Sequence, residues 1–207
     1  MKILNEWKFS NSTVIAEVDE IPRDDQVAHT HQYMMGEYPM LRWQSELDEV
    51  TSNKVKELKK SFKDQPKLQL AAIENGQLVG WTLGWQDNFD STSFFMGASV
   101  VVPEKRRDGL YTALVQKILE MTKERGYQSV WSTHVMTNNP VIIAKLKTGF
   151  TMYGFEMNTL YGPLVKLVYH HSQLRKQALK FRAGAVGETN VLELLRQDLK
   201  PGKGASK

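Results

Sequence analysis

Three consecutive basic residues and a glycine stand where a run of β-branched residues gives way to an apolar series at helical spacing. The cations are Lys105, Arg106 and Arg107, and the glycine is Gly109. The apolar series that follows consists of Leu110, Leu114, Ile118 and Met121. The first amides of a helix have no intrahelical partner, and the helix dipole adds about half a positive charge beside them. A strand, a glycine turn and a helix start in this order predict a site for phosphate or pyrophosphate; the alternative is a solvated basic turn.

The order of residues in this stretch resembles the acetyl-CoA-binding motif of the GNAT family of N-acetyltransferases. In that motif Gln or Arg, two residues, Gly, one residue, and then Gly or Ala cradle the pyrophosphate. Arg106 and Gly109 fit this pattern, and Tyr111 replaces the final small residue. A second stretch, Asn138 to Phe150, is similar to the family's later motif, in which Asn opens a helix that ends in Gly-Phe. The two motifs stand at the family's spacing.

The resemblance implies an α/β (α+β) fold with a central mixed β-sheet flanked by helices. It also implies direct transfer of an acetyl or acyl group from acetyl-CoA to a primary amine of a small molecule or a protein. Backbone N–H groups of the strand before the turn, around Ser99 to Val101, would stabilise the tetrahedral oxyanion. The residues expected to bind acetyl-CoA are Ser99, Val100, Val101, Arg106, Arg107, Asp108, Gly109, Leu110, Tyr111, Thr112 and Asn138.

The acid and base of this reaction are harder to find in the sequence. The family often places a Tyr acid four residues before its Gly-Phe, and this chain has Lys145 there. A protonated Lys145 could stabilise a thiolate, but its ordinary pKa makes it a poor donor near neutrality, and the alternative is a solvent-facing lysine. The family's frequent Glu on the preceding strand is matched by Thr133. His134 has the right pKa class for a base, although strand alternation points it to the other face from Thr133. Tyr153 and Tyr161 could donate a proton, and ordered water could carry protons instead.

The composition limits the possible function classes. The chain has 207 residues, 41% of them hydrophobic, which suits a soluble globular domain with extensions. It has no cysteine, so disulfides, thiolate nucleophiles and cysteine zinc sites are excluded. Its five histidines form no His-Glu-x-x-His arrangement, and we expect no metal site. No run of residues reads as a membrane span or a signal-peptide core, so we expect a cytoplasmic protein.

The net charge of +4 is distributed unevenly. Residues 1–162 carry 18 basic and 20 acidic side chains, whereas residues 163–207 carry 9 basic and 3 acidic ones. The basic character therefore belongs to the end of the chain, which argues against nucleic-acid binding by the main body.

Residue patterns predict the following elements. The expected strands are Thr13–Val18, Leu68–Ile73, Leu78–Trp85, Phe94–Val102, Ser129–Val135, Phe150–Phe155 and Leu164–Tyr169. The expected helices are about 24–37, Ser45–Lys63, Gly109–Arg125, Asn138–Lys147, His170–Arg182 and Glu188–Lys200. Asn75-Gly76 between two apolar runs predicts a hairpin. The methionines and aromatics of 24–37 are interpreted as core or lid, or as one wall of an acceptor pocket.

We expect three regions: an N-terminal arm or short strand over 1–12, the GNAT-like domain over 13–169, and a basic helical extension over 170–207. The extension would pack on the domain or on a second copy of the chain, which makes a homodimer possible; attachment to an anionic membrane or RNA is the less favoured alternative. The predicted function is acetyl-CoA-dependent N-acetyl transfer to an amine. Its rivals are a catalytically weak CoA-binding sensor or scaffold, and an interaction module that uses the basic tail.

Overall fold

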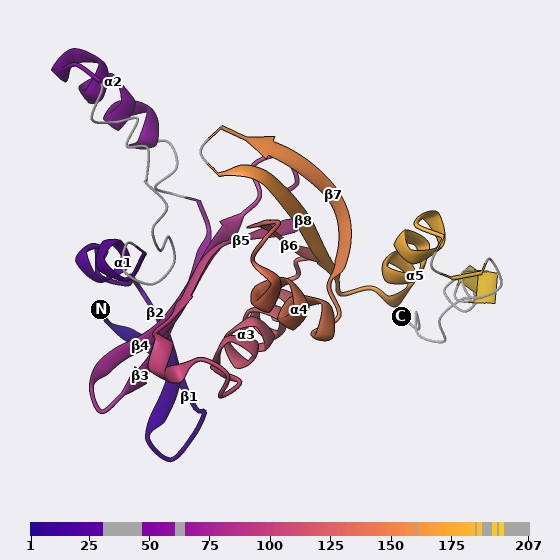
Figure 1. Cartoon of the computed structure of the whole chain (residues 1–207), viewed down its shortest axis with the longest axis horizontal. Coiled ribbons are helices and arrows are strands. Elements are labelled where there is room, and N and C mark those ends of the chain that lie inside the picture. The colour runs from indigo at the N-terminus through magenta and orange to yellow at the C-terminus, as the bar shows by residue number, and fades with distance from the viewer. Residues whose placement is uncertain are drawn as a thin grey trace, which may run out of the picture.

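The computed structural model describes residues 1–30, 47–60, 65–159, 161–184, 186–187, 192–193 and 195–196. These residues form one eight-stranded sheet with helices on both of its faces (Figure 1), which confirms the expected fold class. The strands are β1 (Ile3–Lys8), β2 (Thr13–Val18), β3 (Lys67–Glu74), β4 (Gln77–Gln86), β5 (Ser93–Val101), β6 (Ser129–Val135), β7 (Thr151–Asn158) and β8 (Gly162–His170). The helices are α1 (Arg23–His29), α2 (Glu49–Lys60), α3 (Leu110–Glu124), α4 (Asn139–Lys147) and α5 (Gln173–Arg182).

The strand order is β1-β2-β3-β4-β5-β6-β8-β7, and neighbours are antiparallel except for the parallel pair β5 and β6. That pair is joined only over Ser93–Phe95 and Ser129–Trp131. Both strands continue beyond these residues, β5 to Val101 and β6 to Val135, so the sheet opens between them. We call this opening the fork.

Glycines define the turns around the strands and helices. Asn75 and Gly76 both have positive φ, 50° and 79°, as a tight hairpin between β3 and β4 requires, and this confirms the predicted turn. The helix α3 starts after Gly109, at φ 82°, and Gly126 follows its end at φ 87°. Both glycines therefore adopt the left-handed conformation that side chains disfavour.

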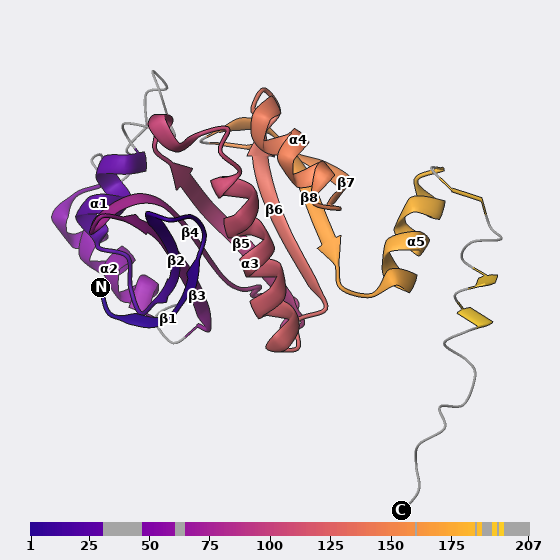
Figure 2. The ribbon, with the colours of Figure 1, turned by 90° about the horizontal axis from the view of Figure 1, so that it is seen from below.

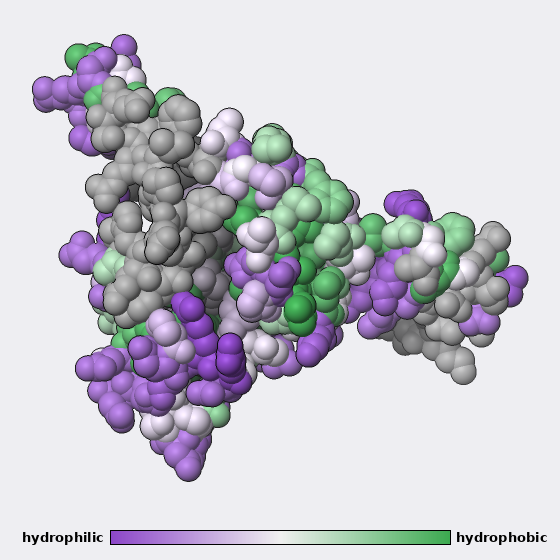
Figure 3. Space-filling view, in the orientation of Figure 1, coloured by the Kyte–Doolittle hydropathy of each residue, from purple (hydrophilic) through white to green (hydrophobic). Residues whose placement is uncertain are grey.

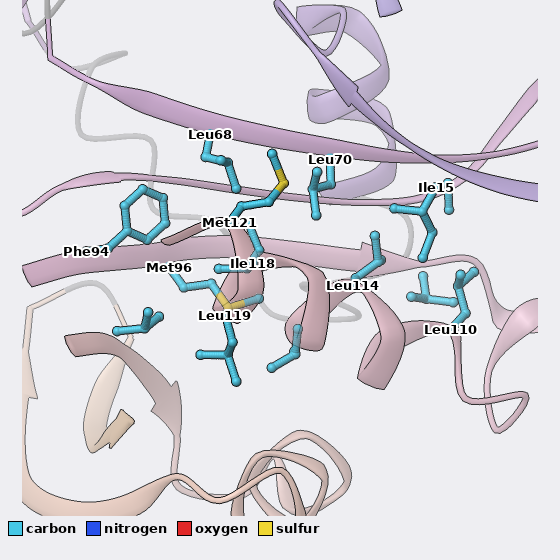
Figure 4. Packing of buried hydrophobic residues seen from close by; sticks show 14 of the residues in the cluster. Ile15, Leu68, Leu70, Phe94, Met96, Leu110, Leu114, Ile118, Leu119 and Met121 are labelled. Carbon is cyan, nitrogen blue, oxygen red and sulfur yellow. The ribbon is translucent and has the colours of Figure 1, made fainter. Parts of the chain in front are cut away.

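The main core lies between the sheet and α3. Figure 4 shows Leu114 and Ile118 of α3 pointing toward Leu70 and Phe94 of the sheet. These four side chains are at most 1% exposed. Burying each of them stabilises the fold by about 1.5–3 kcal/mol, and together they fix the direction of α3 along the sheet.

The opposite face of the sheet carries a smaller cluster around Trp81, Ile21 and Val100. Figure 2 shows α1 on this side of the sheet and α3 on the other. The helix α2 has no buried residue within its bounds, and Val50 and Leu58 are 64% and 69% exposed. Neither Val50 nor Leu58 of α2 is therefore part of the core.

The chain ends differ in how they join the sheet. Of the two alternatives for residues 1–12, the structure has the strand, since β1 pairs with β2 along the sheet edge. The helix α5 stands clear of the sheet (Figures 1 and 2), with Lys176 Nζ 3.7 Å from the centre of the Tyr169 ring. Residues 31–37 of the first expected helix, residues 45–46 and 61–63 of the second, and most of the helix expected over 188–200 lie outside the described residues. The division into three regions stays a prediction.

Hydrophobic side chains are exposed over β7 and α4 (Figure 3). Phe155 and Met157 of β7 are 64% and 78% exposed, and Ile143 and Leu146 of α4 are 50% and 43% exposed. Within the described ranges, no helix is both long and apolar enough to cross a membrane.

The tight packing of β4 against β5 can be tested at Gly84. A Cβ added there would lie 2.4 Å from the Phe95 carbonyl oxygen and 2.5 Å from the Phe94 ring. Gly84→Ala should therefore lower the free energy of unfolding by about 1–3 kcal/mol in urea titrations. Gly154→Ala is the matched control, because its Cβ would meet only the Lys166 side chain at 3.7 Å. Equal stability of the two variants would contradict this packing.

Candidate active site

The fork leaves backbone groups of two strands facing each other without ladder partners. The strand β5 is paired with β4 on its other edge, and β6 is paired with β8 on its other edge, so the edges that turn toward each other beyond Phe95 and Trp131 are unpaired. Along β5 the register with β4 shifts, since Leu83 pairs with Ala98 and Gly84 with Met96. Gly97 is thus an extra residue in β5, and such a bulge turns the following backbone groups.

The basic turn lies where β5 ends and α3 begins. A short 3₁₀ turn over Pro103–Lys105 is followed by Arg107 at φ 71° and Gly109 at φ 82°. The first helical hydrogen bond runs from Ala113 N to the Gly109 carbonyl, so the amides of residues 109–112 precede the helical ladder. A Cβ added at Gly109 would meet nothing within 4 Å, so the space beside this residue is open.

The three cations of the turn have different partners. Lys105 Nζ lies 2.6 Å from a Glu74 carboxylate oxygen, and hydrogen bonds from Lys105, Ser12 and Thr13 lower the pKa of that carboxyl group to about 2. Arg106 donates from Nε to the Val101 carbonyl at 3.0 Å, which ties the turn to the end of β5. Arg107 is exposed, like Asp108 after it. Lys105 is therefore engaged with Glu74 and Arg106 with the Val101 carbonyl, whereas Arg107 is exposed on the turn.

Tyr111, which stands where the family motif has a small residue, packs its ring against the main core. Its hydroxyl group is buried with no hydrogen-bond partner among the described residues, and burial raises its pKa. The neighbouring Leu110 is 2% exposed and belongs to the same core. The ring is thus part of the packing that holds the first turn of α3.

A buried polar chain occupies the closed end of the fork. Lys145 of α4 is 0% exposed, and its Nζ donates to Ser132 Oγ on β6 at 2.9 Å. Nζ also lies 3.1 Å from Met96 Sδ on β5 and 4.4 Å from the centre of the Phe150 ring. Ser132 Oγ is in turn 3.0 Å from His134 Nε2. One lysine therefore bridges the two strands at the point where they part.

Lys145 is not a solvent-facing lysine, and that alternative was wrong. Burial lowers the pKa of Lys145 from the ordinary 10.5 to about 7, so this lysine releases its proton far more readily than the poor donor that was expected. Burial and the nearby Lys145 charge lower the pKa of His134 to about 3. At neutral pH the pair therefore holds at most one proton, and that proton resides on Lys145.

The helix α4 buries its lysine and exposes large apolar side chains. Lys145 is fully buried, whereas Ile143 and Leu146 beside it are 50% and 43% exposed. The helix begins after Asn138, whose backbone φ is −80° and whose side chain makes no capping hydrogen bond. The direction of α4 is fixed at its end by Gly149 and by Phe150, which is 4% exposed in the core. These anchors turn position 145 toward the fork.

The other face of the fork is aromatic, and sequence reasoning missed it. The Phe95 and Trp131 rings lie 4.4 Å apart, and Trp85 lies 5.0 Å from Phe95. The Trp131 indole donates to the Asp87 carboxylate at 3.1 Å. Because Phe95 and Trp131 directly precede Met96 and Ser132, strand alternation places them opposite Lys145. The signal in the sequence was the aromatic residues just before these two positions.

The structure groups only some of the candidate catalytic residues. Lys145 and His134 are joined through Ser132, and His134 faces away from Thr133 as alternation predicts. Tyr153 belongs to the aromatic face, where Lys166 Nζ lies 5.9 Å from its ring and 5.2 Å from that of Trp131. The remaining predicted positions are spread along the fork and around its open end. Ser99 Oγ contacts Thr82 Oγ1 at 2.8 Å, and Val100 is buried in the smaller cluster. Thr112 is half-buried, and Asn138 and Tyr161 are exposed. In the described part of the chain, no three His, Asp or Glu side chains are grouped to hold a metal ion.

The lowered pKa of Lys145 predicts how stability changes with pH. Since the folded protein binds this proton more weakly than the unfolded chain, the cost of burying the lysine is full below pH 7 and disappears as pH rises toward 10.5. Lys145→Met should therefore raise the free energy of unfolding below pH 7, by up to about 5 kcal/mol, and the gain should shrink between pH 7 and 10. Chemical unfolding at several pH values measures it.

Lys147→Met is the control, because it removes the same charge from an exposed position of the same helix. Lys147→Met should change the free energy of unfolding only slightly, and by nearly the same amount at every pH. A Lys145→Met variant that is destabilised equally at every pH would contradict a neutral buried lysine.

Comparison with known proteins agrees with this geometry. The sequence matches the Acetyltransferase (GNAT) family over residues 27–150. No curated protein sequence matches the chain significantly. Among solved structures, the ribosomal-protein-S18-alanine N-acetyltransferase of Escherichia coli superposes with a TM-score of 0.55 at 16% identity, over 78% of this chain and 95% of that one. A Bacillus subtilis acetyltransferase in complex with CoA gives 0.53 at 12% identity, over 76% and 98%. The IAA acetyltransferase of Bacillus cereus gives 0.54 at 11% identity, over 77% and 99%.

These structures share the fold, and the family match spans more than half of the sequence. The chain therefore belongs to the GNAT family of acetyltransferases.

Proposed function

We propose that the protein transfers an acetyl group from acetyl-CoA to a primary amine. The observation that carries the proposal is the fork between β5 and β6, which leads at its open end to the basic turn and the first amides of α3. One extended molecule with a thioester at one end and a pyrophosphate at the other suits both features at once. Acetyl-CoA has this shape, and it is the co-substrate that family membership leads us to propose.

The unpaired edges of β5 and β6 can bind the pantetheine arm, which is the middle part of acetyl-CoA. Its pantetheine arm carries amide groups, and residues 97–101 of β5 and 132–135 of β6 offer N–H and C=O groups that have no partner across the fork. An extended amide chain added to an exposed strand edge is a recurrent binding mode in proteins. The arm would thus replace the ladder that β5 and β6 do not form.

The turn suits the pyrophosphate. The amides of residues 109–112 and the positive end of the α3 dipole favour an anion, and Arg106 and Arg107 add charge beside them. The open space at the Gly109 Cβ position allows a phosphate to approach the backbone closely. The proposed contacts are those predicted from the sequence, and Lys105 is not among them, since it pairs with Glu74.

Acyl transfer at the fork requires few groups. The neutral amine attacks the thioester carbonyl carbon, the C–N bond forms and the C–S bond breaks, and the proton lost by the amine is finally taken up by the CoA sulfur. Backbone N–H groups of β5 after the Gly97 bulge would stabilise the oxyanion. The protein contributes mainly positioning and this electrostatic stabilisation.

The aromatic face suits the apolar body of the acceptor, whose amine would reach through the fork toward the His134 side. Trp131 and Phe95 offer ring faces to that body. The ammonium group of Lys166 lies over the Trp131 and Tyr153 rings, so these rings are compatible with a positively charged group nearby. We therefore propose an acceptor whose amine sits on an apolar or aromatic body. The cytoplasmic location stays a prediction.

Thermal unfolding separates the enzyme from its rivals. Acetyl-CoA binds the folded state only, so a concentration of 100 times Kd should stabilise the protein by about 2.7 kcal/mol and raise its Tm. Assays with a panel of arylalkylamines and other primary amines should then detect release of CoA. Stabilisation without turnover of any amine would favour a CoA-binding sensor or scaffold, and no stabilisation would contradict the whole proposal.

Gly109→Ala tests the position of the pyrophosphate. The added methyl group points into the space that a phosphate would occupy, and Kd for CoA should rise roughly tenfold in isothermal titration calorimetry. The matched control is Gly126→Ala at the other end of α3, which has the same left-handed backbone and the same open surroundings. Both variants should lose about 1 kcal/mol of stability, but only Gly109→Ala should bind CoA more weakly.

A further inference from the structure

Three polar side chains form a continuous line along one edge of the fork. His134 Nε2 contacts Ser132 Oγ at 3.0 Å, and Ser132 Oγ contacts Lys145 Nζ at 2.9 Å. Ser132 and Lys145 are 0% exposed, whereas His134 is half-buried. The line therefore runs from the inside of the fork to its closed, solvent-free end.

The direction of the line follows from the strand. Ser132 is the first residue of β6 beyond the last pair with β5, and His134 is two residues farther into the opening, about 6.6 Å along the strand. Both side chains point to the face covered by α4. Ser99 of β5 contacts Thr82, and register places it on that same face across the opening. Ser99 and His134 therefore border the opening on the same face.

The surroundings of Lys145 favour its neutral form. The groups that contact Nζ are the Ser132 hydroxyl and Met96 sulfur, from β6 and β5, and the Phe150 ring. None of these is a carboxylate, and a buried ammonium ion without a counter-charge is costly. Among titratable groups, His134 stands at the other end of the line, and the Tyr169 ring packs on Phe150 with the ring centres 5.6 Å apart. When it is neutral, a lysine in this place can accept a hydrogen bond from the Ser132 hydroxyl group, whereas in its protonated form it donates to Ser132 Oγ.

We propose that His134, Ser132 and Lys145 form a proton relay that takes the proton of the attacking amine and returns it to the CoA sulfur. The proposal rests on the acetyl transfer proposed above and names the groups that move its proton. His134 is the catalytic residue that faces the reacting atoms, and Ser132 and Lys145 act through it. The relay replaces a glutamate base and a tyrosine acid with one shared site.

The proton count balances over the reaction. As the C–N bond forms, the amine proton passes to His134 Nδ1, the Nε2 proton passes to Ser132, and the Ser132 proton passes to Lys145, which becomes an ammonium ion. As the C–S bond breaks, the same steps run backward and the thiolate leaves as a thiol. Lys145 is neutral before and after, and no further reactant is needed.

The relay needs both His134 and Lys145, the residues at its two ends. His134 by itself, with a pKa of about 3, cannot hold a proton at neutral pH. Lys145, with a pKa of about 7, can hold one and can still release it to a thiolate, because an ordinary thiol has a pKa of about 8.5. The lysine stores the proton between the two steps, and the histidine places it near the substrate.

The test compares wild type with Lys145→Met at a series of pH values, using acetyl-CoA and an amine found active in the panel. The ratio of the two kcat/KM values cancels the titration of the amine itself. The relay predicts a ratio that is small below pH 6, where Lys145 is already protonated, and that rises to roughly a hundredfold or more above pH 8. KM for acetyl-CoA should change little. Ser132→Ala should give the same dependence because it interrupts the line.

Lys147→Met is the matched control, since it makes the same substitution at an exposed position of the same helix, and its ratio should stay near one at every pH. A second readout needs no turnover: the ¹³Cε NMR signal of Lys145 should titrate near pH 7 in the free protein. A titration near 10.5, or a Lys145→Met ratio that is constant with pH, would overturn the relay.

Failure of the relay is distinguishable from failure of the proposed function. If wild type acetylates an amine but the Lys145→Met ratio is flat, the acetyl transfer stands and the relay is wrong. If wild type transfers acetyl to no amine, the proposed function is wrong and the relay falls with it, even where the NMR titration shows a neutral lysine.

Discussion

The parting of β5 and β6 after three residue pairs is the constraint on which the rest of the structure depends. A parallel pair that continued to Val101 and Val135 would satisfy its own backbone groups and leave no edge for a ligand. The strands are held apart beyond the last pair by what each binds on its other side, β4 and β8. The closed end of the opening is then fixed by Lys145, whose Nζ contacts Met96 of one strand and Ser132 of the other.

Lys145 thus combines a structural cost with a chemical use. Burying a lysine among a sulfur, a hydroxyl and an aromatic ring destabilises the fold. The hydrophobic packing of α3 on the sheet supplies the free energy that offsets this cost. Groups with shifted pKa values gather at sites where chemistry requires them. The exposed Ile143 and Leu146 on the same helix strengthen this view, because burial of either in place of the lysine would have been more favourable for stability alone.

Much of the fold was predictable because its signals are local. The β-branched run, the turn glycine and the spacing of Leu110, Leu114 and Ile118 predicted the β5–α3 unit, and the structure has it at those residues. Asn75-Gly76 predicted its hairpin for the same reason. The helix α4 was also predicted with its bounds, but its burial was not. Val141 to Leu146 is apolar on nearly every side, so no periodicity indicates which face packs inward, and the turn toward the sheet depends on distant contacts of Phe150.

The candidate site also has a part that was predictable from the sequence and a part that was not. The anion turn is a property of one continuous segment, and the positions of Arg106 and Gly109 followed from sequence order. The line from His134 to Lys145 joins a strand to a helix, and the aromatic face joins Trp85, Phe95 and Trp131 from three strands. Such groupings depend on the strand order, which alternation along one strand cannot supply.

The most direct measurement of the central claim is a crystal structure of the protein with CoA. The account predicts the pantetheine arm between residues 97–101 of β5 and 132–135 of β6, the pyrophosphate on the amides of residues 109–112, and the sulfur on the side of His134. CoA bound outside the fork, or strands β5 and β6 paired along their whole length in the complex, would contradict it.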